Sequence, residues 1–172
     1  GMPNLVHDEK IKIGDEQLQR NEWIKKELSD SSIEFISKLP KEILCEIEGK
    51  KIYIAHYPMN EDENFRKHIK KAGADENEIM FSGIDANIYL YGHTHREVYN
   101  FKDSKTYINP GALGCPEKTN RAPYGILNIN KEKVEYKQLY VEYDVQEVIK
   151  YIKKIKFPGY KSVLRLFYGI DD

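Results

Sequence analysis

One short stretch reads Tyr89-Leu90-Tyr91-Gly92-His93-Thr94-His95-Arg96, an apolar run that leads directly into two histidines. Residues i and i+2 of a β-strand point to the same side, so a strand end with this spacing can direct His93 and His95 toward one place. Imidazole is the commonest metal ligand among side chains. Gly92 allows a sharp backbone turn ahead of the histidines. The stretch therefore predicts a strand end that carries a candidate metal site.

Two further stretches have related features. Residues 52–58 form an apolar run that ends at His56, and residues 109–114 read Asn-Pro-Gly-Ala-Leu-Gly. Taken alone, a histidine at a strand end is most often an ordinary half-buried residue, and a glycine-rich loop is equally typical of a tight turn between strands. Only the combination of the three stretches indicates a functional site.

The three stretches, in this order, resemble the metallophosphoesterase (calcineurin-like phosphoesterase) superfamily, and more closely its small bacterial and archaeal phosphodiesterase branch. That branch has a strand-end histidine, a Gly-His-x-His motif and an Asn-Pro-Gly-(Ser/Ala) loop. The resemblance extends from about Glu9 to the C-terminus. It implies that His56 and His93 bind one divalent ion and that His95 binds a second.

The same resemblance implies a reaction and its requirements. It implies a metal-dependent phosphodiesterase or phosphatase that hydrolyses a small phosphoester with manganese, zinc, iron or nickel. Arg96, next to His95, is a candidate substrate-binding residue for a phosphate, with a surface salt bridge as the alternative. Asn109 is a candidate for the floor of the site, with a tight turn between strands as the alternative. No catalytic residue is assigned. Three histidines and a water on a single ion are the alternative arrangement, familiar from zinc sites.

The family begins with a βαβαβ segment that carries Asp-x-His, Gly-Asp and Gly-Asn-His motifs. A βαβ unit takes roughly thirty residues, and no such segment fits ahead of His7. We therefore expect residues 1–172 to be a single domain that is truncated at its N-terminus relative to the family. His7 and Asp8 are either a remnant of the third motif or an ordinary terminal loop.

The expected truncation leaves three interpretations of the function. The aspartate that bridges the two ions belongs to the missing segment, so we expect an incomplete two-metal site and impaired or no activity in this chain. A non-catalytic scaffold for protein interactions, derived from the same fold, is the second interpretation. In the third, the sequence is a fragment of an ordinary enzyme.

Composition narrows the class of protein further. The 172 residues suit one domain, and 27 basic against 28 acidic residues argue against a broad nucleic-acid-binding surface. No apolar run approaches the ~20 residues that span a bilayer. Cys45 and Cys115 have no paired spacing, which is typical of a reduced, cytoplasmic protein.

Hydrophobic periodicity and capping signals predict alternating helices and strands. The predicted helices cover residues 15–28, 31–39 (with a Ser31–Glu34 capping box), 60–71, 75–83 and 145–152. The predicted strands cover residues 42–48, 51–55, 88–91, 98–101, 106–108, 124–129 and 134–141. His68 is expected to be a solvated residue of the third helix.

These elements predict an α/β fold, specifically the C-terminal portion of a metallophosphoesterase-like α-β-β-α sandwich. In the family, the missing segment supplies central strands of one sheet. The chain should therefore expose an unpaired, apolar sheet edge. Either the ends of the chain cover this edge or two copies pair across it, and we expect a homodimer.

Overall fold

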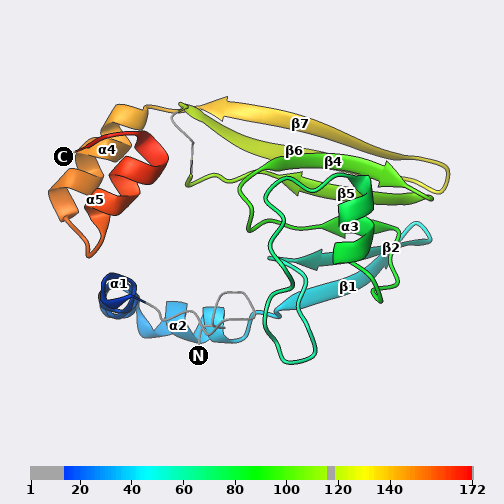
Figure 1. The fold of residues 1–172 in the computed structure, drawn as a ribbon, viewed down its shortest axis with the longest axis horizontal. Helices are drawn as coiled ribbons and strands as arrows, with labels where there is room; N and C mark the ends of the chain where they lie inside the picture. Colours follow the sequence, from blue (N-terminus) through cyan, green and yellow to red (C-terminus); the bar gives the residue numbers. More distant parts are fainter. Residues whose placement is uncertain (1–13, 116–118, 172) are drawn as a thin grey trace. The chain divides into compact units, whose positions relative to one another are not determined.

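The structure is a computed structural model that describes residues 14–115 and 119–171 (Figure 1). Its helices are α1 (Asp15–Glu27), α2 (Asp30–Ser37), α3 (Ala74–Met80), α4 (Val145–Ile155), α5 (Tyr160–Val163) and the π-helical turn η1 (Leu164–Tyr168). Its strands are β1 (Glu42–Ile47), β2 (Lys50–Ala55), β3 (Ile88–Leu90), β4 (Glu97–Lys102), β5 (Lys105–Pro110), β6 (Arg121–Ile129) and β7 (Val134–Glu142).

The described chain divides into two compact units. The first comprises residues 41–113 and 123–140, and the second comprises the remaining described residues. The prediction of a single domain stays a prediction. The α/β class is confirmed, because the first unit combines a mixed sheet with a helix.

The first unit is built on a five-stranded sheet in the order β1-β2-β3-β5-β4. The three central strands run parallel, and β1 and β4 are antiparallel to their neighbours. Ile54, Leu90 and Ile108 are aligned across the central strands. The carboxyl ends of β2, β3 and β5 therefore lie side by side along one end of the sheet, and the histidine-bearing stretches begin there.

One face of this sheet is aromatic. Tyr53, Tyr89 and Tyr107 are aligned across β2, β3 and β5, and each is at most 3% exposed. The rings of Tyr89 and Tyr107 stack with centroids 4.9 Å apart, and Phe81, just after α3, lies 4.8 Å from Tyr89. Alternate residues of the same strands turn isoleucines to the other face, so the central strands bury both faces.

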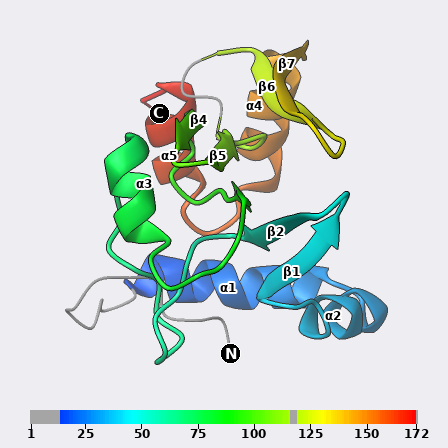
Figure 2. The same cartoon turned by 90° about the vertical axis from the view of Figure 1, so that its right-hand side faces the viewer.

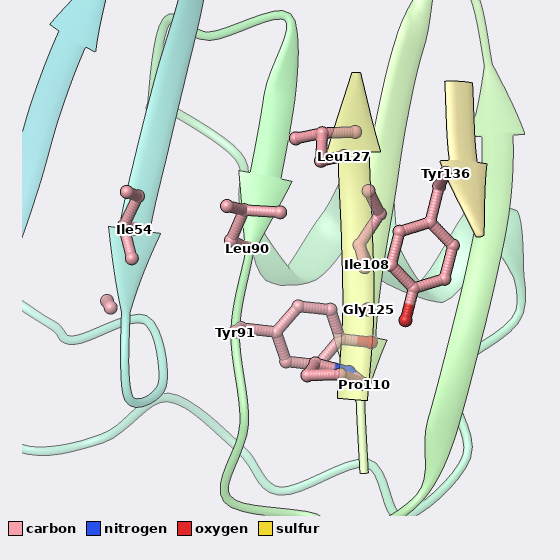
Figure 3. Close-up of a pocket in the computed structure, with 9 residues that line it drawn as sticks. Ile54, Leu90, Tyr91, Ile108, Pro110, Gly125, Leu127 and Tyr136 are labelled. Atoms are coloured by element: carbon pink, nitrogen blue, oxygen red, sulfur yellow. The ribbon is translucent and has the colours of Figure 1, made fainter. Parts of the chain in front are cut away.

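The opposite face packs against the β6–β7 hairpin. The hairpin contributes Leu127, Ile129, Val134 and Tyr136 to a cluster with the buried isoleucines of the sheet. Between the two layers lies an apolar cavity of about 280 Å³, lined by Ile54 and Leu90 from the sheet and by Leu127 and Tyr136 from the hairpin (Figure 3). Gly125 is required here, because a Cβ atom would lie 2.2 Å from the Tyr136 ring.

The edge strand β1 carries exposed apolar side chains. It pairs only with β2 in the sheet, beside which it lies in Figures 1 and 2. Ile43, Leu44 and Ile47 are 44%, 62% and 48% exposed. The edge strand β1 thus carries three exposed apolar side chains, and the expectation of an edge left by missing strands stays a prediction.

The second unit is helical. Ile149 and Ile152 of α4 are buried with Leu164 of η1. The Asp144 side chain caps α4 by accepting hydrogen bonds from the backbone N–H groups of Gln146 and Glu147. No helix among the described residues combines the length and the apolar character needed to cross a membrane.

Two local predictions are wrong. Residues 60–71 form an irregular loop with a bridge between Met59 and Phe65, because Arg66 donates its hydrogen bonds to carbonyl groups elsewhere in the chain. The cap of α2 is Ser29, whose Oγ accepts from Ser32 N, and not Ser31. The hydrogen bond from Ser32 N to Ser29 Oγ thus replaces the cap that the Ser31–Glu34 capping box predicts.

Candidate metal centre

His56 and His93 lie side by side just beyond the carboxyl ends of the parallel strands β2 and β3. The Nε2 atom of His56 lies 3.1 Å from Nδ1 of His93, and the two rings are inclined at 81°. His56 directly follows β2, while His93 lies three residues beyond β3. Two adjacent parallel strands thus bring together histidines that are 37 positions apart in the sequence.

The Gly-His-Thr-His stretch is a loop and not a continued strand. β3 ends at Leu90, and His93 and His95 have φ angles of +65° and +57°. The strand periodicity predicted for the two histidines is therefore wrong. Left-handed backbone is uncommon for residues other than glycine, and histidine is among the residues enriched there. Its occurrence at both histidines is the kind of strain that functional sites contain.

Asn109 holds this loop in place. Its side chain is 0% exposed, and Nδ2 donates to the carbonyl oxygen of Gly92 (2.8 Å) and to Thr94 Oγ1 (3.0 Å). Its Oδ1 accepts from the N–H of Gly111 (3.0 Å). Gly92 N also donates to the His56 carbonyl oxygen (2.9 Å), which links the loop to the end of β2. Both donor hydrogens of the Asn109 amide are therefore engaged within the protein.

Rings from the segment after β2 also pack around His93. The centroids of Tyr57, Phe65 and His68 lie 5.0, 5.1 and 5.2 Å from the His93 centroid. His68 is half-buried and its Nε2 atom is buried, so the prediction of a solvated surface histidine is wrong. The error follows from the helix predicted over residues 60–71, since the real loop turns His68 inward.

Burial lowers the pKa of His56, and the charge of His95 lowers it further. The neutral imidazole is consequently favoured near pH 7, and this is the form that binds metal ions. Arg96, which follows His95 in the sequence, is half-buried.

The pair of nitrogens fits a shared ion. The observed 3.1 Å contact is a hydrogen bond between the two rings. Two imidazole nitrogens at 2.0–2.1 Å from a tetrahedral zinc ion would lie about 3.3 Å apart, which is a similar spacing. Within residues 14–115 and 119–171, no three His, Cys, Asp or Glu side chains form a group that could hold a metal. His7 and Asp8 lie outside the described residues. The structure thus supports convergence of two of the predicted ligands.

The sequence and the fold both have known relatives. Residues 14–132 match the calcineurin-like phosphoesterase superfamily domain. An uncharacterized protein of Methanocaldococcus jannaschii, MJ0912, is 27% identical over 86% of this chain and 63% of its own length. The crystal structure of hypothetical protein PH1004 from Pyrococcus horikoshii OT3 has a TM-score of 0.74 at 18% identity, and the match covers 95% of this chain and 64% of that one.

The chain thus spans just under two thirds of the length of either relative. The similarity to PH1004 concerns the fold alone. The matched span of residues 14–132 contains His56, His93, His95 and Asn109. This match shows that the chain belongs to the calcineurin-like phosphoesterase superfamily.

Proposed function

We propose that the protein is a metal-dependent phosphodiesterase or phosphatase whose ion is held by His56 and His93. The observation that carries this proposal is the 3.1 Å separation of His56 Nε2 and His93 Nδ1 at the carboxyl ends of two parallel strands. A divalent ion bound there would polarise a phosphoryl oxygen and acidify a water molecule. Manganese, zinc, iron and nickel are the candidate ions.

Each residue of the site has a defined task in this proposal. Ligation through these two atoms requires that His56 carry its proton on Nδ1 and His93 on Nε2. His95 is the third candidate ligand, for the same ion or for a neighbouring one. The Arg96 guanidinium would bind an oxyanion of the phosphoester. Asn109 contributes by fixing the loop that carries His93 and His95.

We further propose that this chain by itself hydrolyses phosphoesters slowly. Two-ion catalysis holds its ions a few ångströms apart, which calls for a shared anionic ligand between them. The groups that converge here are imidazoles, which carry no negative charge. The described ligands therefore suit one ion better than two.

The test is hydrolysis of bis(p-nitrophenyl) phosphate with added Mn²⁺. We expect a slow reaction that EDTA abolishes and that falls to the protein-free rate in His93→Ala. Lys67→Ala, which removes an exposed side chain from the neighbouring loop, should keep the wild-type rate. Equal rates in wild type and His93→Ala would contradict the proposal.

A second function is favoured by the exposed edge strand β1. Unpaired edges with apolar side chains are templates for pairing with another chain. Ile43, Leu44 and Ile47 provide such a surface, and we propose that two copies of the protein pair along β1. In this role the protein would be an interaction scaffold. Light scattering should show a dimer that Leu44→Lys converts to a monomer, whereas a monomeric wild type would refute the pairing.

A further inference from the structure

The loop that follows β2 is anchored on both sides of His68. The Tyr57 hydroxyl, in a side chain that is 0% exposed, donates to the carbonyl oxygen of Lys67 (3.1 Å). The hydroxyl oxygen of Tyr57 in turn accepts a hydrogen bond from the N–H of Ile69 (3.1 Å). One buried phenol therefore fixes the backbone immediately before and after His68, although this segment has no regular secondary structure.

Arg66 anchors the preceding part of the loop. Its guanidinium donates to the carbonyl oxygens of Met59 (3.2 Å), Met80 (2.9 Å) and Ser82 (2.7 Å). The first of these lies within the loop, and the other two lie at the end of α3 and just beyond it. Hydrogen bonds to a charged group are roughly twice as strong as neutral ones, so this network is a firm attachment.

These anchors place the His68 ring edge-on against His93. The two centroids are 5.2 Å apart and the planes are inclined at 72°. Tyr57 and Phe65 contact the same His93 ring, with centroids 5.0 and 5.1 Å away. Three rings of this segment thus pack against the His93 imidazole.

We propose that His68 is a positioning residue for the metal ligand His93. Its ring holds the His93 imidazole in the orientation that directs Nδ1 toward His56 Nε2. This inference rests on the proposed function, because it assumes that His93 is a ligand. The role belongs to the flat ring of His68, so a phenylalanine should perform it and an alanine should not.

The test is Zn²⁺ titration of the full chain by calorimetry, with Co²⁺ absorption as a second readout. Residues that orient metal ligands typically contribute 10–100-fold to metal affinity, and we expect a loss of about tenfold or more in His68→Ala. His68→Phe should stay within about threefold of wild type, below that range, with an unchanged Co²⁺ band. The control is Lys67→Ala, whose exposed side chain plays no part in the packing.

The outcomes separate the two proposals. If His93→Ala binds Zn²⁺ as tightly as wild type, the metal site itself is wrong. If His93→Ala loses binding but His68→Ala keeps it, only the positioning role is overturned. An equal loss of Zn²⁺ affinity in His68→Phe and His68→Ala would also overturn the positioning role, because a flat ring at position 68 would then not be sufficient to hold His93. Should His68→Ala fail to fold, His68→Leu takes its place, with the same expected loss.

Discussion

The Nδ2 atom of Asn109 donates a hydrogen bond across 2.8 Å to the carbonyl oxygen of Gly92, the residue that precedes His93. This bond joins the end of β5 to the loop after β3, and it belongs to a fully buried amide. The orientation of His93 and His95 thus depends on a side chain that lies 14 positions further along the chain than His95. The hydrogen bond therefore links Asn109 directly to the histidine motif.

We predict that Asn109→Leu destabilises the protein by about 2–4 kcal/mol. The substitution leaves the Gly92 carbonyl, the Thr94 hydroxyl and the Gly111 N–H without this partner, and each such group costs about 1–3 kcal/mol when buried. Urea denaturation measures the change. Asn128→Leu, on an exposed position of β6, is the control and should alter stability by less than about 0.5 kcal/mol. A similar small effect of both substitutions would show that Asn109 does not hold the loop.

Gly125→Ala should destabilise the contact between the sheet and the β6–β7 hairpin. The added methyl group would lie 2.2 Å from the Tyr136 ring, and overpacking of this kind costs about 1–3 kcal/mol. Thermal denaturation should show the loss, and Tyr136→Leu in the same chain should recover part of it because the clash is removed. Strictly additive effects of the two substitutions would argue against the observed packing.

Alkaline pH should unfold the protein through its buried tyrosines. Burial raises the pKa of Tyr107 to about 12, and burial with the Glu97 charge raises that of Tyr136 to about 12. Because an unfolded tyrosine ionises near pH 10, the native state retains these protons longer, and its stability is complete below about pH 10 and falls toward pH 12.

The free energy of unfolding, measured at about pH 9 and at about pH 11, tests this dependence. The size of the loss follows from the difference between the tyrosine pKa values of the folded and unfolded states. Tyr107→Phe should reduce the loss between the two values, whereas Tyr151→Phe, at a residue 61% exposed, should not. A stability that is constant over this interval would contradict the prediction.

The regular elements were predictable from local patterns. The central strands β2, β3 and β5 alternate a tyrosine with aliphatic residues, so their pairing buries both faces without any special residue. The loop of residues 60–71 was not predictable in this way. Its conformation depends on Arg66 and on the Tyr57 hydroxyl, whose partners are set by the folded chain and not by neighbours in sequence.

The candidate site was predictable only in part. His56 and His93 were identified from strand ends and from a family resemblance, and they do converge. His68 was missed because polar residues around it resemble an exposed helix, and only the loop conformation reveals its position beside His93. A signal was available in Phe65, an apolar residue isolated in a polar segment, which predicts at least one inward turn.

The central claim is that His56 and His93 hold a divalent ion, and metal content tests it most directly. The protein is dialysed against excess Zn²⁺ or Mn²⁺, then against metal-free buffer, and bound metal is measured by mass spectrometry. We predict one ion per chain in the wild type and none in His93→Ala, with both proteins folded by circular dichroism. A wild type without bound metal, or a His93→Ala variant that retains the same amount, would contradict the claim.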